Sequence, residues 1–138
     1  MRKLSIAALV LGLALTSAQA AAAQPVFSEA AGSPFSTAAG PQSIAFSPSG
    51  ALIATADAGA NQVSVFAAGS SGALTPVSGS PFASGGSAPG SVAFSPNGQL
   101  LAVTSFNSST VSVFSVSSAG ALTSVSGSPF TTGGAPDS

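Results

Sequence analysis

The sequence predicts an all-β protein built from two copies of a four-stranded unit. The first observation is an internal repeat, since three segments return 48 positions further along the 138-residue chain: Ala45–Gly50, Val63–Phe66 and Gly72–Thr75. The second is that short alternating runs of apolar and polar residues are separated by Gly- and Pro-containing turns, which is typical of strands. The third is that no segment beyond the N-terminus has a helical apolar stripe free of Gly, Pro and Ser. A repeat of this length indicates a solenoid, a propeller or an array.

The composition excludes several kinds of chemistry. Charged residues make up 4% of the chain, against roughly 25% in an ordinary globular protein. The sequence contains no His, Cys, Trp or Tyr. An imidazole base, a thiolate nucleophile and a zinc site made from the usual His and Cys ligands are therefore excluded.

The N-terminus has the three parts of a secretory signal peptide. Met1–Lys3 is basic, Leu4–Thr16 is apolar, and Ala18–Ala20 supplies a small-x-small cleavage pattern. We expect residues 1–20 to be removed and the protein to be secreted or periplasmic. A membrane anchor is the alternative, but the apolar run is shorter than the roughly 20 residues that a spanning helix needs. A lipid anchor is excluded because no Cys follows the run.

Cleavage would leave a chain with almost no charge. Both basic residues leave with the signal, and Glu29, Asp57 and Asp137 remain, for a net charge of −3. Without Lys or Arg the mature chain cannot neutralise phosphates, so we expect no binding to nucleic acid. For the same reason we expect no binding to an anionic membrane surface.

The expected organisation follows the repeat. Residues 21–41 form an N-terminal segment with one strand at Val26–Phe35, and residues 131–138 form a C-terminal tail. The first unit covers residues 42–82, with four expected strands: Ser43–Ser47, Leu52–Ala56, Gln62–Ala67 and Leu74–Ser78. The second unit covers residues 83–130 and repeats the plan: Ser91–Ser95, Leu100–Thr104, Thr110–Val116 and Leu122–Ser126. None of these expected strands contains a charged residue.

Four short antiparallel strands joined by tight turns within about 48 residues describe one blade of a β-propeller. The sequence Gly-Ser-Pro-Phe occurs three times, at 32–35, 79–82 and 127–130. Its Pro predicts a strand end, because Pro cannot donate to the ladder. Its Phe is expected to pack between blades.

The repeat resembles that of a known family. Segments 89–98, 100–105, 110–114 and 120–123 are similar to the blade repeat of bacterial YVTN and lactonase-type β-propellers, which include phosphogluconolactonase-like enzymes. Ala102–Ser105 occupies the place of that family's Tyr-Val-Thr-Asn sequence. The resemblance covers Val26–Ser138 and implies a propeller of seven blades. It implies lactone hydrolysis only weakly, because the repeat encodes the scaffold.

Two blades and one closing-type strand make an incomplete propeller. Propellers close with about 4–8 blades, so two outer faces are expected to lack a neighbour. Among the residues expected there are Ile44, Phe46, Val63, Val65, Phe94, Val111 and Val113. Three explanations stay open: a ring of several copies, docking on a larger propeller partner, or a truncated gene product. We expect a homo-oligomer or a larger partner.

The candidate sites are few. Asp57 and Asn61 flank a glycine-containing loop and are weak candidates for a Ca²⁺ site. The second unit has Ser105 in place of Asp57, which favours an Asx turn instead. We expect no catalytic residue, no cofactor and no other metal ligand, because nothing in the mature chain could activate a serine.

Three functions are compatible with these observations. The first is a secreted, non-catalytic propeller-repeat protein or fragment with a scaffold or binding role and an unknown ligand. The second is a lactonase-type hydrolase, which the resemblance alone implies. The third is a self-assembling structural β protein, because the strands are uncharged and blade faces are open.

Overall fold

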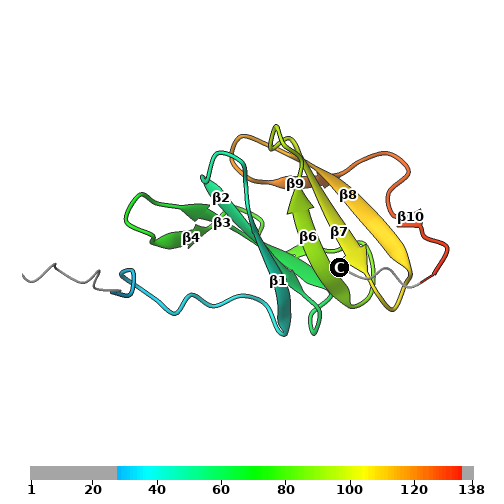
Figure 1. Ribbon diagram of the computed structural model, residues 1–138, viewed down its shortest axis with the longest axis horizontal. Coiled ribbons are helices and arrows are strands. Elements are labelled where there is room, and N and C mark those ends of the chain that lie inside the picture. Colours follow the sequence, from blue (N-terminus) through cyan, green and yellow to red (C-terminus); the bar gives the residue numbers. More distant parts are fainter. Residues whose placement is uncertain (1–27, 135–138) are drawn as a thin grey trace, which may run out of the picture.

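The computed structural model describes residues 28–134, and these residues form two antiparallel sheets that lie side by side (Figure 1). The expected signal peptide lies outside the described residues, as do the start of the expected N-terminal strand and the last four residues of the tail. Within the described range no helix is long and apolar enough to cross a membrane.

Each sheet is one blade with its strands in sequence order, which confirms the predicted fold class. The first sheet contains β1 (Pro41–Phe46), β2 (Leu52–Asp57), β3 (Gln62–Ala68), β4 (Leu74–Pro76) and β5 (Phe82–Ala83). The second contains β6 (Pro89–Phe94), β7 (Leu100–Ser105), β8 (Thr110–Val116), β9 (Leu122–Ser124) and β10 (Phe130–Thr131). All pairings are antiparallel. Strand β2 extends to Asp57, so one strand does carry a charge, contrary to the prediction.

The fourth strand of each blade is interrupted. Strands β4 and β5 both pair with β3, and β9 and β10 both pair with β8. The Gly-Ser-Pro-Phe sequence fills the interruption, where its serine hydroxyl replaces a missing ladder partner. The backbone N–H of Val65 donates to Ser80 Oγ at 2.8 Å, and that of Val113 donates to Ser128 Oγ at 2.8 Å. This local bond explains why the motif is repeated as a unit.

The core lies between the blades. The Val63 and Val65 side chains of the first blade pack with Leu101, Val103 and Phe114 of the second in one buried cluster. Burying each such side chain stabilises the fold by roughly 1.5–3 kcal/mol. Val63 and Val65 therefore do not lie on an outer face, and that expectation is wrong. Phe94 also packs against this cluster rather than on an outer face.

The outer-face prediction is correct for two residues of the first blade. Ile44 is 62% exposed and Phe46 is 63% exposed, although both are large and apolar. Their neighbours Ser43 and Ala45 face the second blade, and Ser43 Oγ accepts a hydrogen bond from the backbone N–H of Val92 at 3.4 Å. The alternation of a strand therefore directs Ile44 and Phe46 away from the other blade.

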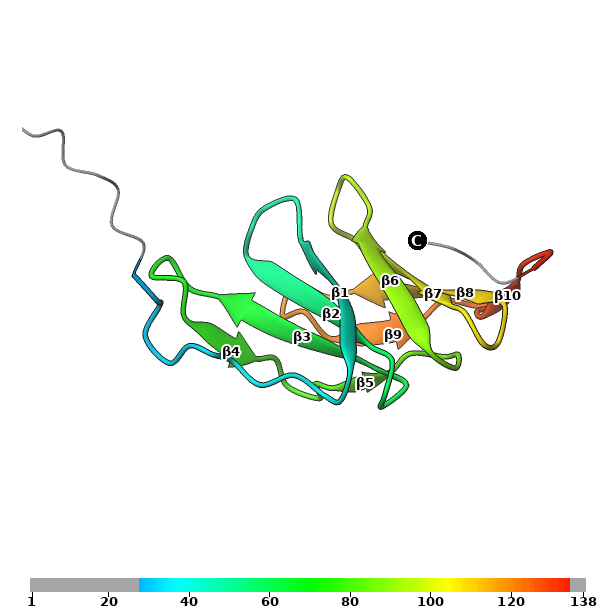
Figure 2. The ribbon, with the colours of Figure 1, turned by 60° about the horizontal axis from the view of Figure 1, so that its bottom comes forward.

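The segment before β1 lies along the first sheet, but it is not a strand. Residues 28–35 form no ladder, so the expectation of a strand is wrong for this part of Val26–Phe35. Its position is nevertheless that of a preceding blade's last strand, since it runs past β4 toward β1 (Figure 2). A Cβ built on Gly72 would lie 3.1 Å from Ala30, as one on Gly120 would lie 3.0 Å from Val77. A strand needs a paired neighbour, and the described chain offers none here.

Candidate functional site

Three loops meet at one end of the sheets and are joined by hydrogen bonds. They follow β2, β5 and β7, at residues 58–61, 84–88 and 106–109. The backbone N–H of Ala88 donates to Asn61 Oδ1 at 2.8 Å, and that of Ser87 donates to Ser108 Oγ at 3.0 Å. The loop at 84–88 therefore bridges the β2–β3 loop of the first blade and the β7–β8 loop of the second.

Asp57 lies at the end of β2 and is completely buried. Its Oδ1 accepts a hydrogen bond from the Thr55 hydroxyl at 2.9 Å. Its Oδ2 accepts bonds from the Ser64 hydroxyl at 2.6 Å and from the Ser64 backbone N–H at 3.1 Å. These partners lie on β2 and β3, so the predicted Asx turn is wrong. The carboxylate joins two strands of the first blade instead of organising a loop.

The side-chain oxygens of Asp57 and Asn61 bond to different parts of the chain. The Asp57 oxygens are occupied by Thr55 and Ser64, while Asn61 Oδ1 accepts from Ala88. Asn61 has a φ of 55°, a left-handed conformation that asparagine tolerates. Among residues 28–134 no group of three or more His, Cys, Asp or Glu side chains could hold a metal ion. Asp57 therefore joins strands β2 and β3, and Asn61 holds the loop at 84–88.

The corresponding position in the second blade lacks the carboxylate. Ser105 replaces Asp57 and Ser112 matches Ser64, and both serines are completely buried. The Oγ atoms of Ser105 and Ser112 have no hydrogen-bond partner. They lie beneath Gly85 and Gly86, because a Cβ on either glycine would come within 2.6 Å of a serine Oγ. Close backbone packing therefore fills the space that a larger polar side chain would need.

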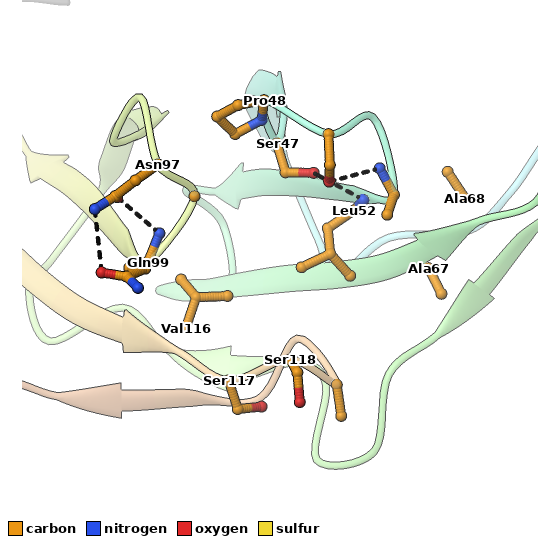
Figure 3. A pocket seen from close by; sticks show the side chains of 14 residues that line it. Ser47, Pro48, Leu52, Ala67, Ala68, Asn97, Gln99, Val116, Ser117 and Ser118 are labelled. Carbon is orange, nitrogen blue, oxygen red and sulfur yellow. Dashed lines mark hydrogen bonds between the residues drawn. The ribbon is translucent and has the colours of Figure 1, made fainter.

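A groove opens between the two blades at the opposite end of the sheets (Figure 3). Its volume is about 680 Å³. The first blade contributes its β1–β2 turn, the start of β2 and the end of β3. The second blade contributes its β6–β7 and β8–β9 turns and the end of β8. Gly98 lies opposite Pro48 across it, since a Cβ on Gly98 would lie 3.4 Å from Pro48 Cδ.

The lining of the groove is partly apolar, partly polar and uncharged. Its apolar part includes Leu52 and Val116, which also pack against the interblade core. Its polar part consists of hydroxyl and amide side chains: Ser47, Ser49, Asn97, Gln99, Ser117 and Ser118. Asn97 Nδ2 donates to Gln99 Oε1 at 3.1 Å, so the two amides hold each other in place. Such a surface can hydrogen-bond neutral groups, and it has no acid or base among its residues.

The remaining titratable residue of the described chain is remote from both ends of the interblade core. Glu29 is exposed and lies in the segment before β1. Asp137 lies outside the described residues. Of the acidic residues, the structure thus describes Asp57, which is buried, and Glu29, which is exposed.

The fold and the groove define a partial β-propeller with an uncharged surface between its blades. The comparison with protein families agrees, because the profile described as "Lactonase, 7-bladed beta-propeller" matches residues 9–135. The chain belongs to this family of seven-bladed β-propellers. No curated protein matches the chain.

Solved structures show the same architecture. The chain is similar to a Pseudomonas aeruginosa periplasmic gluconolactonase, with 27% identity, a TM-score of 0.59 and coverage of 70% of this chain and 28% of that one. It is also similar to a candidate 6-phosphogluconolactonase from Bacteroides fragilis, with 26% identity, a TM-score of 0.59 and coverage of 63% and 24%. A Lactobacillus plantarum protein at 19% identity, with a TM-score of 0.59 and coverage of 71% and 28%, shares the fold. The chain thus spans about a quarter of the length of these structures.

Sequence reasoning missed the groove and the hydrogen-bonded group around Asp57. Two of the turns that line the groove are 48 residues apart, and their Ser-Pro-x-Gly sequences indicate turns only. The group around Asp57 could have been found by comparing the repeats. The pair Asp57 and Thr55 is unique to the first copy, whereas the serine at 64 returns at 112.

Proposed function

We propose that this protein is an exported, non-catalytic member of the lactonase-type propeller family with a binding or scaffold role. One observation carries the proposal: Asp57, the only acidic residue on a strand of the described chain, is completely buried and hydrogen-bonded. General acid–base catalysis needs a titratable group within reach of the substrate. The described part of the chain presents no such group in the three hydrogen-bonded loops at 58–61, 84–88 and 106–109 or in the groove.

The groove supports a neutral, hydroxyl-bearing ligand. Its hydroxyl and amide groups can donate and accept hydrogen bonds, and its apolar residues Leu52 and Val116 can contact the carbon skeleton of a ligand. A charged ligand would find no counter-ion among the lining residues. Carbohydrates and sugar lactones have this chemistry.

An assay of lactone hydrolysis tests the non-catalytic role. The chain from Ala21 to Ser138 would be purified and checked for β structure by circular dichroism, and then given D-glucono-δ-lactone. We expect no hydrolysis above the rate in buffer. A rate well above buffer that is lost in Asp57→Asn, with the fold retained, would overturn the proposal.

Lactone hydrolysis is the second candidate, and family membership favours it. In that case the reaction would need groups that several blades supply together. The same assay separates the two candidates, because a real lactonase would show saturation with substrate.

Export rests on the expected signal peptide and on the likeness to a periplasmic gluconolactonase. Expression of the full chain in a bacterial host, followed by N-terminal sequencing of the periplasmic fraction, tests it. We expect a mature N-terminus at Ala21. Retention of Met1 in the cytoplasm would contradict export.

A further inference from the structure

The interface between the two blades shows what kind of surface fits each open face. The first blade contributes one face to this interface, which includes Ala45, Leu52, Ala54, Ala56, Val63 and Val65. The second blade contributes the opposite face, which includes Val92, Phe94, Leu101 and Phe114. We call these the small-residue face and the aromatic face.

The second blade has its own small-residue face, and it is open. Its residues are Ala93, Leu100, Ala102, Val111 and Val113, each 48 positions after its counterpart and identical to it. Leu100 is 42% exposed, and none of the five packs against the interblade core. These five residues of the surface that binds a blade inside the chain are therefore repeated on its outside, whereas Thr104 replaces Ala56 of the internal interface.

The first blade has a corresponding aromatic face, and this face is open at β1. Ile44 and Phe46 correspond to Val92 and Phe94 and are exposed by 62% and 63%. Val92 is only 6% exposed, because the first blade covers it. Ile53 and Phe66 correspond to Leu101 and Phe114 and are already buried. Thr55, which is also buried, stands where Val103 packs in the internal interface.

From this repetition we propose that the protein assembles head to tail. In one copy the second blade presents its small-residue face, and this face docks on the aromatic face that the first blade of another copy presents. The contact repeats one that the chain already makes. Asp57 shares the aromatic face with Ile53, because alternate residues of β2 point to the same side. Its carboxylate is completely buried and hydrogen-bonded to Thr55 and Ser64, so no exposed charge among the described residues of either face opposes the contact. Different surfaces meet, so the contact is heterologous and leads to a ring if its rotation closes. This proposal goes beyond the proposed function and does not depend on it.

Docking requires one rearrangement. Ala30 lies against Gly72 at the outer edge of the aromatic face of the first blade. At the equivalent place in the internal interface, Val77 of the first blade lies against Gly120 of the second. In the assembly, Val125 of the second copy takes the place of Ala30, since Val125 is the counterpart of Val77. The backbone N–H of Ala38 also donates to Ser64 Oγ at 3.2 Å, so residues 28–38 compete with the second copy for this face.

Two variants, each blocking one face, test the proposal. Phe46→Asp blocks the aromatic face and Val113→Asp blocks the small-residue face. The matched control is Phe106→Asp, which makes the same change at a residue that is 52% exposed but lies in the β7–β8 loop. Masses are measured by size-exclusion chromatography with light scattering over a wide range of concentration. Circular dichroism verifies the fold of each variant. If Phe46→Asp loses its β signal, Ile44→Asp takes its place, and if Val113→Asp loses it, Val111→Asp takes its place.

We expect the mature wild-type chain and Phe106→Asp to form the same larger species, and each face variant to lose it. An equal mixture of Phe46→Asp and Val113→Asp should form a dimer and nothing larger, because each copy keeps one open face. A monomeric wild-type chain, a larger species that persists in either face variant, or a mixture that stays monomeric would overturn the proposal.

Discussion

The hydroxyl of Ser64 donates a 2.6 Å hydrogen bond to the buried carboxylate of Asp57. Its counterpart in the second blade, Ser112, is equally buried and has no partner, since Ser105 stands where Asp57 would be. Two blades with nearly the same backbone thus place the same side chain in opposite energetic situations. A buried polar group without a partner costs stability, while a bonded one contributes to it.

This difference predicts opposite effects of one substitution at two equivalent sites. Ser64→Ala removes a donor from a buried carboxylate and should lower the free energy of unfolding by about 1–3 kcal/mol. Ser112→Ala removes an unpaired hydroxyl and should leave stability unchanged or raise it by up to about 1 kcal/mol. Urea unfolding of both variants, followed by circular dichroism, measures the two values. Equal losses at both sites would contradict this account.

Gly86 is predicted to be intolerant of any side chain. A Cβ there would lie 2.5 Å from both the Cβ and the Oγ of Ser105. Gly86→Ala should therefore lower stability by about 1–3 kcal/mol through overpacking. The control is Gly90→Ala on β6, where a Cβ meets nothing within 4 Å and should be neutral or slightly stabilising. The difference between their urea midpoints is the measurement, and similar midpoints would show that the loop can move aside.

Ser80 is predicted to stabilise the first blade through one side-chain bond. It accepts the backbone N–H of Val65, which is completely buried. Ser80→Ala would leave that N–H without a partner, at a cost of about 1–3 kcal/mol. Ser78→Ala changes an exposed serine of the same turn and should have little effect. Thermal unfolding of the two variants compares them, and an unchanged transition in Ser80→Ala would show that the bond contributes nothing.

The competing segment gives a prediction about assembly. Ala30→Asp would place a longer, charged side chain where Ala30 lies close to Gly72, and so should unseat residues 28–35. We expect a larger fraction of the assembled species at a given concentration, because the edge becomes free. Light scattering at matched concentrations of wild type and variant measures that fraction. A smaller fraction would show that the segment supports the contact rather than competing with it.

Most of the fold could be predicted from the sequence because the local signals agree with one another. Turn sequences such as Pro48–Gly50 and Pro96–Gly98 separate alternating runs, and the strands β1–β3 and β6–β8 begin and end within two residues of the predicted positions. Alternation gives the two faces of a strand, but it does not say which face meets the neighbour. That is why Val63 and Val65 were assigned to the wrong side.

The N-terminal strand and the site could not be predicted for a different reason. Residues 28–35 have the sequence of a last strand, but a strand forms only with a partner, and the partner depends on the rest of the fold. Asp57 looks like a loop residue in sequence, yet Thr55 and Ser64 draw it into the sheet. The groove depends on turns from both blades, so it follows from packing rather than from any single motif.

The most direct test of the two complementary faces is cross-linking between copies. The sequence contains no cysteine, so introduced thiols report only on the chosen positions. Phe46→Cys and Val113→Cys are prepared as separate chains, mixed, and treated with a short bismaleimide. We predict a covalent dimer that contains one of each chain, in clear excess over dimers of either chain with itself. Dimers of Phe46→Cys with itself in equal yield, or no cross-link at all, would contradict a head-to-tail contact.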